Sequence, residues 1–200
     1  FKPSHVYSPI NKDELIDILE KHKSGKIRVV ASKHSWSNLI ETEDVLIDMS
    51  HFDYVKIQEK NHETSVTVGA GCKVKKLLAE LNRKGLTIPS VGLIDQQTIA
   101  GATATGTHGS GKHSLSHYIE SIQLACFDEN GKSAQIVDIT EGVELQAARC
   151  SLGCLGVVVE MTLPCIPQYF VQEKSTFYDS IEEVLALEKE APLQQFYLIP

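Results

Sequence analysis

One segment of the chain combines glycine, hydroxyl residues and small side chains in a way that could bind an anionic ligand. Residues 101–111 hold four glycines and four Ser or Thr residues, without a large apolar side chain. Glycine lets a ligand approach backbone N–H groups, which donate to phosphate oxygens, and the hydroxyls add further donors. The segment therefore predicts a loop that binds a phosphate or pyrophosphate. A flexible surface loop is the alternative, but linkers are rich in Ser, Pro and charges rather than Thr and Ala.

Part of this segment comes close to the P-loop of nucleotide triphosphatases. Residues 106–113 carry lysine at the expected seventh position, but the eighth is His113 rather than the Ser or Thr that binds Mg²⁺. Residues 98–105 are not the buried apolar strand that feeds such a loop, and the Rossmann pattern G-x-G-x-x-G is absent. These departures argue against a triphosphatase. A nucleotide-binding module without redox activity stays open as an alternative.

Two further turns accompany the glycine-rich segment. Residues 31–36 read Ala-Ser-Lys-His-Ser-Trp and follow a predicted strand, and residues 151–158 read Ser-Leu-Gly-Cys-Leu-Gly-Val-Val and lead into another. Residues 92–101, ending in Ile-Ala-Gly, lead into the glycine-rich segment. Together these motifs resemble the FAD-binding domain of the vanillyl-alcohol oxidase (PCMH-type) flavoproteins. The nearest branch is that of the aldonolactone and alditol oxidases, which are L-gulonolactone oxidase-like, and the match covers about residues 10–165.

The resemblance implies an α+β fold in which two α/β subdomains hold FAD between them. The FAD-binding domain would cover residues 1–167, with subdomains at about residues 1–68 and 69–167. Residues 168–200 would be the beginning of a truncated substrate (cap) domain, because the last predicted strand has no partner after it.

The resemblance also implies which residues contact the cofactor. The first turn and the glycine-rich segment would hold the pyrophosphate, and Gly153 and Val158 would lie near the adenosine or flavin edge. The full set of implied FAD-binding residues is Ala31, Ser32, Lys33, His34, Ser35, Trp36, Gly92, Ile99, Gly101, Ala102, Thr105, Gly106, Thr107, His108, Gly109, Gly111, Gly153, Val157 and Val158.

The first turn departs from the family pattern Gly-x-Gly-His-Ser-Trp. Ala31 and Lys33 replace the two glycines. If position 33 requires a positive φ, lysine is strained there by roughly 1 kcal/mol or more, although its charge could face the pyrophosphate. His34 aligns with the histidine that often bonds covalently to the flavin, and a neutral imidazole is a competent nucleophile near neutral pH.

Other polar and aromatic residues have structural interpretations. His108 either shapes its turn or contacts the flavin, and core packing is the favoured role of Trp36, the only tryptophan. Asp95 and Gln96 are expected to cap a short helix that leads into Ile99. No catalytic role is assigned to any residue of this chain, and no metal site is predicted.

The implied activity is that of an FAD-dependent oxidoreductase. It would oxidise a CH–OH group of a sugar-derived lactone or polyol by hydride transfer to flavin N5, and O₂ or another acceptor would reoxidise the flavin. Another branch of the same flavoprotein superfamily, with a different alcohol or hydroxy-acid substrate, is the alternative enzyme.

The elements that must position these residues follow from hydrophobic periodicity and end signals. Asn11 and Glu14 form a capping box at the start of a helix that Gly25 ends. Short apolar or alternating runs predict strands, and apolar stripes at helical spacing predict helices. The predicted strands are residues 27–31, 45–49, 54–57, 65–68, 119–127, 133–139, 157–163 and 196–199, and the further helices are residues 74–84, 144–150 and 180–190.

Composition excludes several classes of function. The net charge is −7 and no Lys/Arg cluster is longer than the pair Lys75-Lys76, which argues against nucleic-acid and anionic-lipid surfaces. No apolar run is long enough for a membrane helix. The five cysteines form no C-x-x-C pair and fit no zinc template, and Cys150 and Cys154 are expected to be small buried hydrophobes. A reducing compartment, the cytoplasm, is therefore expected.

Overall fold

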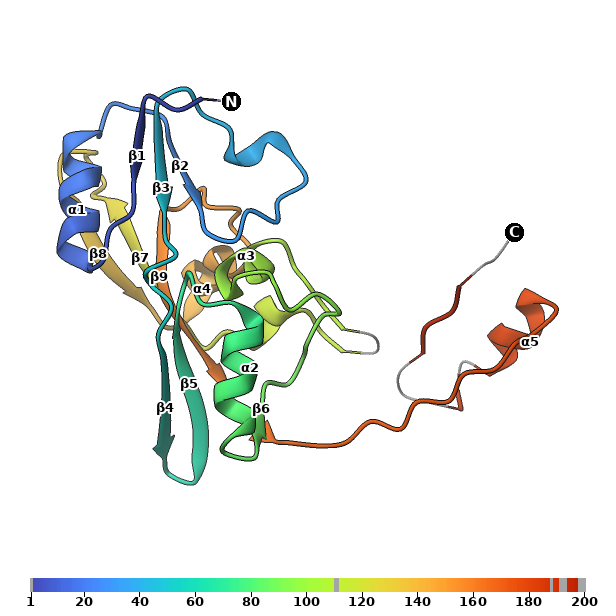
Figure 1. The fold of residues 1–200 in the computed structure, drawn as a ribbon. Coiled ribbons are helices and arrows are strands. Elements are labelled where there is room, and N and C mark those ends of the chain that lie inside the picture. The colour runs from blue at the N-terminus through green and yellow to red at the C-terminus, as the bar shows by residue number, and fades with distance from the viewer. Residues whose placement is uncertain (1, 110–111, 188, 191–193, 198–200) are drawn as a thin grey trace.

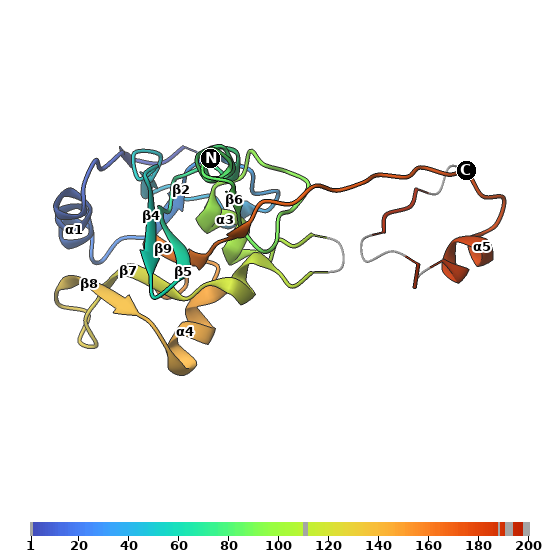
Figure 2. The same ribbon diagram turned by 90° about the horizontal axis from the view of Figure 1, so that it is seen from below.

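The computed structural model describes residues 2–109, 112–187, 189–190 and 194–197. The described chain has a small parallel sheet near the N-terminus, a larger antiparallel sheet, and a C-terminal segment that runs away from both (Figure 1). Figure 2 shows the same C-terminal segment leaving on the side opposite α1 (Lys12–Lys21). This arrangement confirms the predicted α+β class.

The N-terminal sheet has three parallel strands in the order β1-β3-β2. Helix α1 (Lys12–Lys21) connects β1 to β2, and the side chain of Asn11 accepts the N–H of Glu14 at 2.9 Å, as the capping box predicts. The buried residues Leu15 and Leu19 are one turn apart and face the core. The strands are β1 (His5–Tyr7), which the sequence pattern did not predict, β2 (Ile27–Val30) and β3 (Val45–Asp48).

The larger sheet has the order β4-β5-β9-β7-β8, and all neighbouring strands are antiparallel. Alternate residues of β9 are buried, but they belong to two different hydrophobic clusters. Val157 and Val159 pack with the α1 side, whereas Met161 and Leu163 pack with α2 (Val74–Asn82) and its neighbours. The strands are β4 (Val55–Lys60), β5 (Glu63–Gly69), β7 (Ser121–Phe127), β8 (Ala134–Ile139) and β9 (Val157–Pro164).

The backbones of residues 49–52 and 69–71 come unusually close where the chain passes from one sheet to the other. The N–H of Gly71 donates to the carbonyl oxygen of Phe52 at 2.9 Å. A Cβ atom on Gly71 would lie 2.0 Å from the carbonyl oxygen of Met49, so only glycine fits. The predicted subdomain boundary, between residues 68 and 69, falls at this contact.

Short helices cover the larger sheet and end as their sequence signals indicate. Gly85, just beyond α2, has the positive φ of +69° that favours glycine. The antiparallel pairing of β6 with β10 joins the segment after α2 to the segment after β9. The remaining elements are α2 (Val74–Asn82), α3 (Ile99–Ala104), α4 (Gly142–Arg149), β6 (Leu86–Thr87), β10 (Ile166–Pro167) and 3₁₀ helices at Asn38–Ile40 and Leu115–Tyr118.

The glycine-rich segment is not the loop that its composition predicts. Residues 101–104 belong to α3, and among the described residues of the segment only 105–109 are irregular. Thr98 caps this helix through its hydroxyl, which accepts the N–H of Gly101, so the expected capping role of Asp95 and Gln96 is wrong. Tertiary packing overrides the weak helix propensity of Gly and Thr, because Ile99 and Ala102 are fully buried.

Several other expectations are corrected. Trp36 is 99% exposed and therefore does not pack in the core. Cys150 and Cys154 are exposed rather than buried. The last helix, α5 (Ile181–Ala186), is shorter than predicted, residues 196–197 form no strand, and residues 198–199 of that predicted strand lie outside the described residues.

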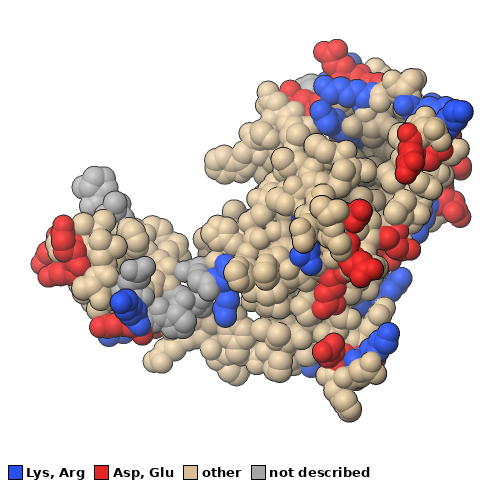
Figure 3. Space-filling view, turned by 180° about the vertical axis from the view of Figure 1, so that it is seen from behind, with Lys and Arg blue, Asp and Glu red and all other residues tan. Residues whose placement is uncertain are grey.

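The surface carries charges of both signs. On the face in Figure 3, acidic and basic side chains are interspersed, and the visible described residues form no continuous basic patch. None of the helices in the described part of the chain has the length and apolar character needed to span a membrane.

Candidate functional site

A cavity of about 240 Å³ lies where three distant segments of the chain meet. Its walls come from β2 with the turn that follows, from α3 with the residues just before it, and from the turn that precedes β9. The predicted site residues that line it are Ala31, Ser32, Lys33, His34, Ser35, Gly101, Thr105, Gly153, Val157 and Val158. The structure therefore brings together parts of all three motifs.

The first turn is anchored directly to the start of α3. The N–H of Thr98 donates to Oγ of Ser32 at 3.1 Å, across 66 residues of sequence. Because this oxygen acts as the acceptor, the hydroxyl proton of Ser32 remains available to a ligand. His34 and Lys33 follow on the exposed part of the turn.

Lys33 adopts the left-handed conformation, with φ +57°. The positive φ on which the predicted strain of this lysine depends is therefore present. We expect Lys33→Gly to raise the free energy of unfolding of the cofactor-free chain by about 0.5–1 kcal/mol, as relief of strain exceeds the entropic cost of glycine. Urea denaturation measures the change. Lys33→Ala is the matched control, because it removes the charge and keeps the Cβ; equal stabilities of the two variants would contradict the explanation.

Helix α3 presents a face of small residues to the cavity. Ile99 and Ala102 point into the core, and the opposite face is the one that lines the cavity. Four residues of this face line the cavity, as two pairs: Ala100 with Ala104, and Gly101 with Thr105. The members of each pair are four residues apart, and residues at that spacing share a helix face. A ligand can therefore approach the α3 backbone closely.

The third segment turns sharply before β9. Leu152 and Gly153 have positive φ values of +52° and +79°. A Cβ on Gly156 would lie 2.6 Å from the carbonyl oxygen of Ala125, and its φ is +143°, so this position also requires glycine. The turn leads into β9, and Val158, the second residue of that strand, lies on the cavity wall.

The cavity is positively charged although the chain carries a net charge of −7. Arg28 and Lys33 line it, and no Asp or Glu is found among its described lining residues. The Nε atom of Arg28 is buried and has no hydrogen-bond partner among the described residues. A buried N–H without an acceptor is costly, so a bound anion would stabilise this side chain. The remaining walls are largely apolar and suit flat aromatic rings.

Other residues predicted to bind the cofactor lie elsewhere. Ile99 and Ala102 are in the core, and Trp36 points into solvent. Contacts between residues 91–92 and 107–109 are tight, since a Cβ on Gly109 would meet the carbonyl oxygen of Val91 at 2.6 Å. Absent from the cavity lining are Trp36, Gly92, Ile99, Ala102, Gly106, Thr107, His108 and Gly109, while Gly111 lies outside the described residues. Their assignment to the cofactor stays a prediction.

Sequence reasoning missed several lining residues. Arg28 could have been identified from the sequence, because it is the one charged residue in the apolar run that forms β2. The small residues Ala100 and Ala104 could be found only once residues 99–104 were recognised as a helix. The missed lining residues also include Leu39, Ile40, Met49, Ala70, Gln97, Thr98, Leu152 and Gly156.

The thiols of Cys72 and Cys165, which lie outside the cavity lining, are not nucleophiles. Desolvation by burial raises the pKa of Cys72 to about 11, against the opposing effect of Lys76, and burial likewise raises the pKa of Cys165 to about 11. Both thiols are therefore protonated at neutral pH and unreactive.

A family model described as an FAD binding domain matches residues 3–136 of the chain. The chain belongs to this family of FAD-binding domains. The resemblance inferred from the three motifs is therefore confirmed, and so is FAD as the cofactor. The cations, the orphaned Arg28 N–H and the small-residue face of α3 fit an anionic dinucleotide with flat rings.

Known relatives of this FAD-binding domain include longer oxidases. A long-chain alcohol oxidase from an uncultured marine euryarchaeote is 46% identical over 199 residues, which is 100% of this chain and 42% of the relative. L-gulonolactone oxidase from Bos taurus is 30% identical over 186 residues, which is 92% of this chain and 42% of the relative. The chain thus spans about two-fifths of the length of these relatives.

A solved structure shares the fold. A solvent-stable cholesterol oxidase superposes with a TM-score of 0.75 at 20% identity, covering 82% of this chain and 35% of that protein. The predicted FAD-binding fold is thereby confirmed.

Proposed function

We propose that this chain is the FAD-binding part of an oxidoreductase that oxidises a CH–OH group. The convergence of three separated segments on one positively charged cavity is the observation that carries the proposal. FAD, when bound, supplies a two-electron acceptor for hydride from the substrate carbon. The residues of this chain bind and orient that cofactor and exclude water from part of it.

The proposed roles of the lining residues follow from their chemistry. Arg28 and Lys33 would neutralise the diphosphate, and the free hydroxyl proton of Ser32 would donate to one of its oxygens. The small-residue face of α3 would let the dinucleotide lie against the helix. The apolar wall, which includes Ile40 and Val158, would contact the flat rings.

Two substrate classes are supported by the relatives. L-gulonolactone oxidase favours a sugar-derived lactone or polyol, and the relative with 46% identity favours a long-chain alcohol. We propose the lactone or polyol as the substrate, with O₂ or another acceptor as oxidant and a location in the cytoplasm. Anaerobic loss of the visible flavin absorbance on addition of aldonolactones, polyols or long-chain primary alcohols to the FAD-loaded protein distinguishes the two classes.

Cofactor binding itself is tested by the visible spectrum of the purified chain. We expect flavin absorbance and saturable binding of FAD to the cofactor-free chain. A colourless chain that remains folded and binds ATP with Mg²⁺ instead would overturn the proposal in favour of a nucleotide-binding module.

His34 is proposed as the residue that bonds covalently to the flavin, since it lines the cavity on an exposed turn. Acid precipitation of the native chain should leave the yellow colour in the pellet. His34→Ala should release all of it into the supernatant, because acid unfolds the protein and frees a cofactor held only by contacts. His51→Ala, at an exposed histidine outside the cavity, is the control and should behave like the native chain. A native chain that releases its flavin would mean noncovalent FAD.

A further inference from the structure

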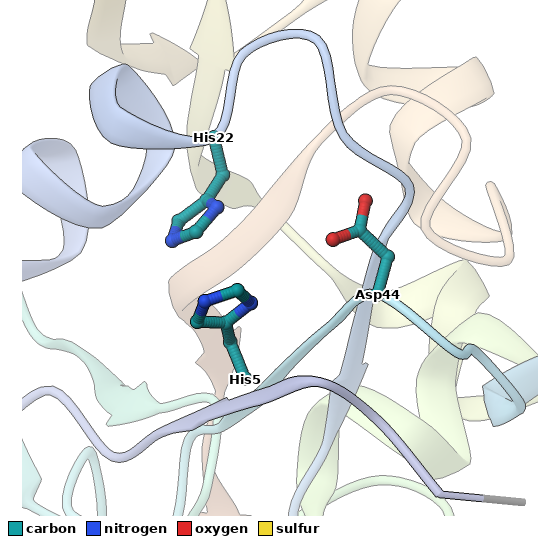
Figure 4. Close-up of side chains that lie close together, drawn as sticks. All are labelled: His5, His22 and Asp44. Carbon is teal, nitrogen blue, oxygen red and sulfur yellow. The ribbon is translucent and has the colours of Figure 1, made fainter.

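Two histidines and an aspartate converge at the N-terminal sheet. His5 begins β1, His22 follows the last turn of α1, and Asp44 directly precedes β3. One side-chain ligand atom from each lies within 4.8 Å of those from the other two. Figure 4 shows the two imidazole rings close together, tilted relative to each other, with the carboxylate beside them.

The three positions are held by hydrogen bonds. The backbone N–H of His5 donates to the carbonyl oxygen of Asp44 at 2.9 Å, which fixes the two strands side by side. One carboxylate oxygen of Asp44 accepts the N–H of Lys26 at 2.7 Å and leaves the other oxygen for a ligand. The carboxylate is therefore already oriented toward the two rings.

His22 is oriented in the same way. Its Nε2 lies 2.8 Å from the hydroxyl of Tyr7, and this hydrogen bond leaves Nδ1 of the same ring free. Histidines that ligate metals generally donate their second ring N–H to an oxygen acceptor, which sets the tautomer. The Tyr7 hydroxyl can supply that acceptor.

We propose that His5, His22 and Asp44 form a binding site for a divalent transition metal, with Zn²⁺ as the probe. Two imidazole nitrogens and one carboxylate oxygen are the donors that Zn²⁺ and its neighbours in the first transition row prefer. Three protein ligands leave the fourth tetrahedral position to water. Ligand atoms of a tetrahedral zinc lie about 3.3–3.4 Å apart, so binding draws the exposed His5 ring inward.

The site is separate from the FAD cavity. None of its three residues lines that cavity. The site sits where β1 and β3 begin, whereas the Ala31–Ser35 turn follows the end of β2 in the same parallel sheet. A bound metal would tie the end of α1 to the beginnings of β1 and β3 and stabilise this sheet. One cation is nearby: Nζ of Lys21 lies 5.6 Å from the centre of the Tyr7 ring. Its positive charge lowers the affinity of the site for a metal cation, and it contributes no ligand.

Calorimetric titration of the untagged, EDTA-treated full chain with ZnCl₂ tests the proposal. We expect a site that binds one Zn²⁺ per chain and a rise in the thermal unfolding temperature with added zinc. His5→Ala, His22→Ala and Asp44→Asn should each weaken this site by about tenfold or more, because each removes one ligand. Asp44→Asn keeps an oxygen for the Lys26 N–H, so the local fold is preserved.

His51→Ala removes an exposed histidine outside the cluster and should leave the affinity unchanged. The unfolding temperature in EDTA checks that each variant is folded. The proposal is overturned if the native chain does not bind Zn²⁺, or if folded His5→Ala and Asp44→Asn bind it as tightly as the native chain.

Discussion

Replacing Ala104 by Phe should nearly abolish FAD binding while the chain remains folded. Ala104 lies on the small-residue face of α3 that lines the cavity, one turn from Ala100. A phenyl group there would occupy space that the cofactor needs. We expect affinity to fall by about 100-fold or more, equivalent to about 2.8 kcal/mol.

Titration of the cofactor-free chain with FAD, followed by quenching of flavin fluorescence, measures this effect. Ala79→Phe is the matched control, because Ala79 lies on the exposed face of another helix, α2. This control should bind FAD as the native chain does. Native affinity in Ala104→Phe would mean that the cofactor does not lie against α3.

Gly71→Ala should destabilise the chain by about 3 kcal/mol or more, and this is the largest stability effect that we expect. The new Cβ would lie 2.0 Å from the carbonyl oxygen of Met49, and backbone atoms cannot rotate away as a side chain can. Relief requires the two sheets to separate at the contact of residues 49–52 with 69–71. The hydrogen bond from Gly71 to Phe52 would be lost in the process.

Urea denaturation measures the change, with Gly85→Ala as the comparison. Gly85 has a φ of +69° and no atom within 4 Å of an added Cβ, so its substitution should cost only about 1 kcal/mol. Equal costs at the two positions would show that the close backbone approach is not what constrains Gly71.

Local signals in the sequence predicted much of the fold. The Asn11 cap, the alternation in β5 and the glycine after α2 each depend on neighbouring residues, and the structure has all three. Helix α3 was not predicted, because its Gly and Thr residues are poor helix formers and burial of Ile99 and Ala102 stabilises it. Strand β1 was not predicted because three residues carry too little periodicity.

The candidate site was likewise predicted only in part from the sequence. The three turns were identified as motifs, and the strain at Lys33 followed from a missing glycine. Which side chains face the cavity depends on packing across more than a hundred residues, as for Arg28 in β2 and Gly156 just before β9, neither of which was predicted. The cluster of His5, His22 and Asp44 is similarly hidden, since their spacing matches no metal-binding pattern.

The position of β9 has a consequence for biosynthesis. It is the last strand of the large sheet to leave the ribosome, yet it lies at the centre, between β5 and β7. Until residues 157–164 emerge, the hairpins β4-β5 and β7-β8 each expose an unpaired edge that invites pairing with other nascent chains. The nascent chain is therefore most prone to aggregate before translation has passed this strand.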